Sequence, residues 1–158
     1  MAKEVKTNAL RMLDKLKIPY EFKTYSCENF EDGLQVAKLL GESPGKTLKT
    51  LVTVGKSAKY YVFVLPVDRE MDLKKCARAV GEKSLETLHV KDIQAVTGYI
   101  RGGCSPIGMK KQFRTVIHES ARELDHVIVS GGRLGLQLIL KPDDLIKACS
   151  GEYADIIA

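Results

Sequence analysis

The stretch from Thr97 to Gly108 reads TGYIRGGCSPIG and holds four glycines and one proline. That composition fits neither a regular helix nor a central strand, because glycine weakens both and proline lacks the N–H that either needs. Glycines also expose main-chain N–H groups and let a ligand approach the backbone closely. A tight connection between two packed elements is the alternative interpretation. One basic residue lies within the stretch and three follow it, which makes it a candidate binding surface for an anionic or ester substrate: Arg101, Lys110, Lys111 and Arg114.

The composition is that of an ordinary globular protein, with 44% hydrophobic and 28% charged residues. At this length we expect residues 1–158 to form one domain with its own core. No apolar run is long enough to cross a bilayer and no secretory signal is evident, so a cytoplasmic protein is expected. The formal net charge of +5 permits binding to a polyanion. Because there is no Lys/Arg tract, any basic surface must be assembled by folding.

The four cysteines are far apart and form no CxxC pair, and none of the three histidines has metal-ligand spacing. We therefore expect reduced thiols, no metal site and no cofactor.

The hydrophobic pattern alternates between helical and strand periods along the whole chain. It predicts helices at 5–17, 32–40, 72–80, 90–97 and 142–149. It predicts strands at 20–25, 47–54, 60–65, 84–88, 114–118, 126–130 and 134–140. Residues 55–59 join two β-branched and aromatic runs, which is typical of a hairpin. Strands mixed with short helices and connected by hairpins indicate a mixed α/β (α+β) fold.

Lys49 interrupts the strand pattern of residues 47–54 and is the first candidate for chemistry. If Leu48, Thr50 and Val52 share one face, Lys49 lies on the other with Leu51 and Thr53. Such a lysine either extends to solvent along an apolar surface or holds its charge in a pocket. In the second case its ammonium group can anchor an oxyanion, a phosphate or an ester carbonyl.

Other polar residues are weaker candidates. Cys104 could be a nucleophile only with a nearby base to lower its pKa, and a small apolar filling role is the alternative. Neither Ser105 nor Ser130 lies in a Gly-x-Ser-x-Gly elbow, so a serine triad is not supported. Both serines could donate hydrogen bonds to a ligand or simply cap turns. The Asp143–Asp144 pair is interpreted as favouring the start of the last helix.

Several motifs together resemble the YbaK/EbsC family of free-standing aminoacyl-tRNA editing proteins. They are KTL at 49–51, LKK at 73–75, the glycine stretch with Lys110 and Lys111, VSGGR at 129–133 and DDL at 143–145. The resemblance covers nearly the whole chain and is closest to the Cys-tRNA(Pro) deacylase branch. The sequence is also similar to the editing domain of bacterial prolyl-tRNA synthetases. The resemblance implies a mixed twisted sheet or partly closed barrel surrounded by short helices.

What the resemblance implies is a hydrolase- or lyase-type deacylase that cleaves the ester of mischarged Cys-tRNA(Pro). The family's essential lysine falls on Lys49, which would position the terminal nucleotide or the ester, while the thiol of the substrate attacks its own ester. The implied partners are the acceptor end of tRNA and, as a second candidate, prolyl-tRNA synthetase; neither a membrane nor DNA is expected. The implied substrate-binding residues are Tyr25, Thr50, Gly102, Gly103, Ser105 and Ser130.

Two departures from the family pattern bear on the amino-acid preference. His118 stands where relatives often carry Asp or Asn, and the strand after Gly135 is less acidic than in many relatives. Three alternatives stay open: a non-catalytic module that binds tRNA or a synthetase, a deacylase for another small amino acid, and a thiol hydrolase that uses Cys104.

Overall fold

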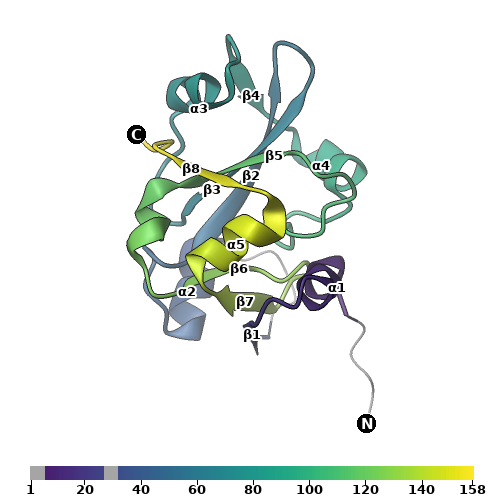
Figure 1. Cartoon of the computed structure of the whole chain (residues 1–158), viewed down its shortest axis with the longest axis vertical. Coiled ribbons are helices and arrows are strands. Elements are labelled where there is room, and N and C mark those ends of the chain that lie inside the picture. The colour runs from purple at the N-terminus through teal and green to yellow at the C-terminus, as the bar shows by residue number, and fades with distance from the viewer. Residues whose placement is uncertain (1–5, 27–31) are drawn as a thin grey trace.

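The computed structural model describes residues 6–26 and 32–158 (Figure 1). Its helices are α1 (Asn8–Lys15), α2 (Gly33–Leu40), α3 (Leu73–Val80), α4 (Val90–Thr97), the short 3-10 helix η1 (Glu119–Glu123) and α5 (Pro142–Cys149). Its strands are β1 (Glu21–Thr24), β2 (Leu48–Gly55), β3 (Tyr60–Pro66), β4 (Leu85–Thr87), β5 (Arg114–His118), β6 (Val127–Ser130), β7 (Leu136–Leu140) and β8 (Glu152–Ala154). None of the described helices is long and apolar enough to span a membrane.

The predicted mixed α/β fold is confirmed, and two short elements were missed. Neither η1 nor β8 has a hydrophobic period of its own, and β8 forms by pairing with β5. The partly closed barrel is not observed in the described part of the chain, where the strands form two open sheets.

The larger sheet has the strand order β4-β2-β3-β5-β8. Strands β2 and β3 form the predicted antiparallel hairpin, with Val52 opposite Val62. Strand β3 also pairs with β5, and β5 with β8, in parallel. As expected from its two apolar faces, β3 is central and is buried along nearly its whole length.

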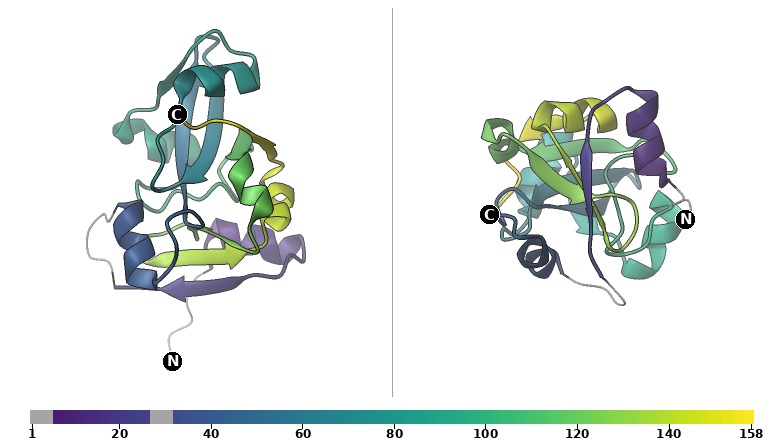
Figure 2. Two further views of the ribbon diagram at one scale, coloured as in Figure 1. Left: turned by 90° about the vertical axis from the view of Figure 1, so that its left-hand side faces the viewer. Right: turned by 90° about the horizontal axis from the view of Figure 1, so that it is seen from below.

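The smaller sheet has the antiparallel order β1-β7-β6 and runs across the lower end of the β2–β3 hairpin (Figure 2). The two sheets are joined at one point. There Thr47 and Ile128 form a parallel bridge, and the Ile128 N–H donates to the carbonyl oxygen of Lys46 at 2.9 Å. The start of β2 is therefore attached to β6.

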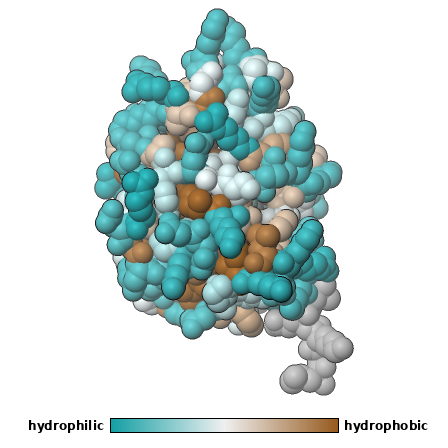
Figure 3. All heavy atoms as spheres, viewed as in Figure 1, coloured by the Kyte–Doolittle hydropathy of each residue, from teal (hydrophilic) through white to brown (hydrophobic). Residues whose placement is uncertain are grey.

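Two clusters of buried apolar residues form the core. The first joins both sheets with α1 and α5, and the second packs α3 against the other face of the larger sheet. Leu48 and Val52 belong to the first cluster, whereas Leu51 packs against the second, so the predicted alternation along β2 is confirmed. The surface of the molecule on the side of α5 is mostly hydrophilic, with small apolar areas (Figure 3).

The loop after α4 is held by polar contacts to its own backbone. The Tyr99 hydroxyl donates to the carbonyl oxygen of Ile107 at 2.7 Å. Gly108 has a φ of +73° and lies against α1, so that a Cβ there would be 2.7 Å from the main-chain carbon and oxygen of Asn8. Part of the glycine content is thus explained by close packing.

Replacing Gly108 by alanine tests this packing. Gly41 is a matched control, because it has a similar φ of +67° but nothing within 4 Å of the position that a Cβ would take. Both substitutions carry the strain of the left-handed region, while Gly108→Ala adds a steric clash of about 1–3 kcal/mol. We expect a lower free energy of unfolding for Gly108→Ala in urea denaturation. Equal losses in the two variants would contradict the packing described.

Candidate active site

A cavity of about 500 Å³ lies beside the part of β2 between its bridge to β6 and its pairing with β4. At Thr47 the strand is bridged to β6, and at Thr53–Gly55 it pairs with β4. Between these points one edge of β2 has no neighbouring strand among the described residues. The cavity occupies that opening, and its volume is in the range of small-molecule binding sites.

Segments distant in the sequence surround this opening. The start of α2, the loop after β3, the segment from β4 into α4, the glycine loop and the strands β6 and β7 all contribute. The lining is mainly apolar, and most of the surrounding segments contribute polar side chains. The polar and charged lining residues are Asp32, Thr47, Lys49, Thr50, Thr87, Arg101, Cys104, Ser130 and Gln137.

Thr50 supplies hydrogen-bonding groups at the open edge. The carbonyl oxygen of Thr47 accepts a hydrogen bond from the N–H of Val67, on the edge of β2 that faces β3. The carbonyl oxygen of Val52 accepts one from the N–H of Leu88, on the opposite edge. Because bonding directions alternate along an antiparallel strand, the N–H and C=O of Thr50 point to the same edge as those of Val52. The Thr50 Oγ1 is buried without a hydrogen-bond partner in the described structure. An unpaired buried hydroxyl at a cavity wall is a candidate ligand contact.

Lys49, Ser130 and Gln137 lie on one side of the joined sheets. Ser130 and Gln137 are direct partners in the β6–β7 pair. Lys49 and Ser130 each follow the Thr47–Ile128 bridge by two residues, so their side chains share a face. The Lys49 side chain is half-buried, and its ammonium group makes no ion pair or hydrogen bond with the described residues. The pocket interpretation of Lys49 is therefore favoured over that of a surface lysine.

Four of the predicted site residues line this cavity: Lys49, Thr50, Gly102 and Ser130. The structure does not bring Tyr25, Gly103 and Ser105 to it. Tyr25 follows β1, on the far side of β7 from β2. Gly103 is buried against the backbone of Arg133. Ser105 is fully buried, and its Oγ accepts from the N–H of Ile107, as in the turn-capping interpretation.

Cys104 lines the cavity but is not an activated nucleophile. Burial raises the pKa of its thiol to about 11. The described residues that line the cavity include no histidine. The thiol thus remains protonated at neutral pH, which agrees with the filling role.

Gln137 is one of the cavity residues that the sequence analysis did not predict. It is the lone polar residue of the strand Leu136–Leu140, and its exposed fraction is 6%. In the sequence, this strand stands out as less acidic than in many relatives. That Gln137 lies at the cavity follows only from its pairing with Ser130.

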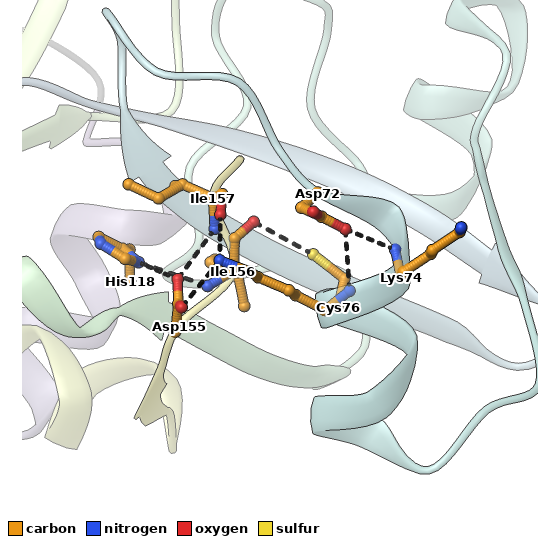
Figure 4. Close-up of polar contacts among 8 residues, drawn as sticks. Asp72, Lys74, Cys76, His118, Asp155, Ile156 and Ile157 are labelled. Atoms are coloured by element: carbon orange, nitrogen blue, oxygen red, sulfur yellow. Dashed lines mark hydrogen bonds and ion pairs between the residues drawn. The ribbon is translucent and has the colours of Figure 1, made fainter.

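The other departure, His118, lies elsewhere. Its ring faces Asp155 and Ile156 near the C-terminus (Figure 4), and its Nδ1 accepts from the Ile156 N–H at 3.4 Å. Burial lowers the pKa of His118, so the ring is neutral at pH 7. His118 borders a separate cavity with Lys46 and Arg69. The substitution at this position therefore does not change the cavity of Lys49.

Metal-ligating side chains do not cluster in the described residues: no group of three or more His, Cys, Asp or Glu could hold an ion. The groups that line the cavity are an ammonium and a guanidinium group, a carboxylate, hydroxyls, an amide, the thiol of Cys104 and main-chain groups.

Comparison with known proteins places this arrangement in a family. The model of the aminoacyl-tRNA editing domain matches residues 27–148, which include Lys49, the glycine loop and both walls of the cavity. The chain belongs to the aminoacyl-tRNA editing family. Within that family, the chain is 49% identical over 154 residues to EbsC of Enterococcus faecalis, a candidate Cys-tRNA(Pro)/Cys-tRNA(Cys) deacylase. The match covers 96% of this chain and 93% of EbsC.

Solved structures show the same fold at low sequence identity. A candidate trans-editing enzyme for prolyl-tRNA synthetase is 21% identical, with a TM-score of 0.83 over 98% of this chain and 99% of its own. A hypothetical protein is 20% identical, with a TM-score of 0.86 over 96% of this chain and 99% of its own. The architecture of the editing family is thus shared with these structures.

The raised pKa of Cys104 predicts slow alkylation. With a pKa of about 11, only about one thousandth of the thiol is ionised at pH 8, and the thiolate fraction rises about tenfold per pH unit. We expect the iodoacetamide labelling rate of Cys104, followed by peptide mass spectrometry, to keep rising up to about pH 11. The urea-denatured protein serves as the control with an ordinary thiol pKa. A labelling rate that levels off near pH 8 would show an activated thiol instead.

Proposed function

We propose that the chain is a trans-editing deacylase that cleaves the ester of mischarged Cys-tRNA(Pro). The observation that carries the proposal is Lys49, a half-buried lysine that lines the cavity and whose ammonium group has no counter-ion among the described residues. An ester that reacts with a nucleophile develops negative charge on its carbonyl oxygen. An ammonium group held beside it stabilises that charge.

The substrate class is supported by the family and by charge. EbsC, at 49% identity, is named for Cys-tRNA(Pro) and Cys-tRNA(Cys). The net charge of +5 favours approach of the tRNA backbone without reading its sequence. The cavity is large enough for the aminoacyl ester together with part of the terminal nucleoside. We infer that tRNA(Pro) itself is selected outside the cavity, with prolyl-tRNA synthetase as the candidate partner.

The nucleophile is then supplied by the substrate. The cysteine thiol of the cargo gives up its proton, and its sulfur attacks the carbonyl carbon of the same residue. A sulfur–carbon bond forms, the bond from that carbon to the ribose oxygen breaks, and that oxygen takes up a proton. The products are a four-membered thiolactone and tRNA with a free terminal hydroxyl. Water later opens the thiolactone to cysteine.

This route needs positioning and charge stabilisation from the protein. Holding a thiolate next to its own ester gives a high effective concentration of the nucleophile. Lys49 supplies charge at the carbonyl oxygen or the terminal phosphate, and the edge N–H of Thr50 is a second donor on the same wall. A lining without histidine and with a protonated Cys104 favours this route over a protein nucleophile.

Deacylation of Cys-tRNA(Pro) by three variants tests the proposal. Lys49→Ala removes the ammonium group, and we expect a loss of about 10²–10³-fold in the single-turnover rate, the usual effect of removing one stabilising donor. Lys56→Ala is the charge-matched control, because Lys56 is exposed in the turn of the β2–β3 hairpin. Cys104→Ala and Lys56→Ala are expected to retain the rate of the unmodified chain within a few fold.

Two outcomes would contradict the proposal. Full activity of Lys49→Ala, or loss of activity in Cys104→Ala, would reverse the assignment of the reactive groups. If the unmodified chain binds Cys-tRNA(Pro) and leaves the ester intact, the chain is a binding module.

A further inference from the structure

We propose that Gln137 determines the amino-acid specificity of the cavity by hydrogen-bonding the polar atom in the side chain of the cargo amino acid. This inference rests on the proposed function. It adds Gln137 as a specificity residue and the polar side-chain atom of the amino acid as the group that Gln137 contacts. The substrates that it favours are esters whose amino acid carries a thiol or hydroxyl, over the alanyl ester of similar size.

Gln137 is a nearly buried residue whose amide has no hydrogen-bond partner in the described part of the chain. The exposed fraction of the residue is 6%, and its side chain makes no hydrogen bond with the described residues. The amide atoms are not among the fully buried unpaired atoms of the described residues, and the residue lines the cavity. The side chains of Leu136 and Leu138 pack in the core on one face of β7, and Gln137 points to the opposite face, where it lines the cavity. An amide at a cavity wall that makes no hydrogen bond with the described residues is a candidate contact for a ligand.

The position of Gln137 places it beside the reacting group. It is opposite Ser130 in the β6–β7 pair, and Ser130 is beside Lys49 across the junction of the two sheets. The Ser130 Oγ accepts from the N–H of Gly132 at 3.2 Å, which leaves its own hydrogen available to donate. All three residues line the cavity. A ligand whose ester lies at Lys49 thus has its adjoining atoms near the amide.

Burial indicates which part of the substrate reaches Gln137. The outer lining is exposed, with fractions of 49% for Leu34 and 54% for Val90, whereas Gln137 and Thr47 are almost fully buried. The amino acid is the last group on the tRNA chain. When the 3′ end enters from solvent, the amino acid goes deepest and the nucleotide stays near Leu34 and Val90. The buried amide therefore meets the amino acid.

The amide suits a thiol in both of its protonation states. Its oxygen accepts from an S–H group, and its NH₂ group donates to a thiolate. A methyl group offers neither contact and leaves the amide unpaired, and sites that hydrogen-bond a substrate group discriminate strongly against analogues lacking it. The same contact holds the sulfur in place for attack on its own ester.

The test uses two stable ligands that differ by one sulfur atom. These are the cysteinyl and alanyl amides of 3′-amino-3′-deoxyadenosine, whose amide bond replaces the ester. Their affinities for the whole chain are measured by calorimetry with the unmodified protein, with Gln137→Met and with Gln94→Met. Methionine matches glutamine in size but has no amide, and Gln94 is an exposed control on α4.

We expect the unmodified protein and Gln94→Met to bind the cysteinyl ligand at least tenfold more tightly than the alanyl ligand. Gln137→Met should reduce that ratio to near one while its thermal midpoint stays equal or rises, since a merely structural amide would lower it. Gln137→Asn, with the same group on a shorter stem, should regain part of the ratio.

Three results would overturn the inference. The first is a cysteinyl-to-alanyl ratio unchanged in Gln137→Met. The second is an equal weakening of both ligands, which would place the amide at the nucleoside. The third is equal binding of both by the unmodified protein while Lys49-dependent deacylation persists. If the unmodified protein neither binds nor deacylates, it is the proposed function that fails.

Discussion

The opening in the hydrogen bonding of β2 is the constraint on which the rest of the structure depends. Strand β2 is bridged to β6 at Thr47 and pairs with β4 from Thr53, and its edge between them has no neighbouring strand among the described residues. Unpaired main-chain groups at a strand edge bind other chains or ligands readily. Here the opening is enclosed by α2, α4 and the glycine loop, which turns an exposed edge into a cavity of about 500 Å³.

The same opening explains why the reactive groups come together. A residue at this edge is held rigidly by its bonds to β3 and still faces a ligand. Lys49 therefore has a fixed backbone, a half-buried stem and no counter-ion among the described residues. Because β6 leaves β2 at this point, Ser130 and its partner Gln137 form the adjacent wall. The arrangement supplies charge and hydrogen bonds, which suits a reaction whose nucleophile comes with the substrate.

Much of the fold, and the strand that carries Lys49 to the cavity, could be predicted from the sequence, because both rest on local patterns. The alternation of apolar residues around Lys49 identified its strand, and Asp72 and Gly81 marked the ends of α3 as predicted. Tyr25 and Ser105 were expected at the site from the family resemblance. However, β1 is separated from β2 by two strands, and the Ser105 hydroxyl bonds within its own loop. The place of Gln137 in the cavity could not be predicted from its sequence neighbours, because it depends on the register of β6 with β7 and on the bridge from β6 to β2.

The most direct test of the central claim is a crystal structure with the cysteinyl amide of 3′-amino-3′-deoxyadenosine bound. The account predicts its amino acid inside the opening of β2, with the carbonyl oxygen within hydrogen-bonding distance of the Lys49 Nζ. The adenosine should lie toward Leu34 and Val90. A ligand bound instead in the cavity beside His118, or with Lys49 turned away into solvent, would contradict it.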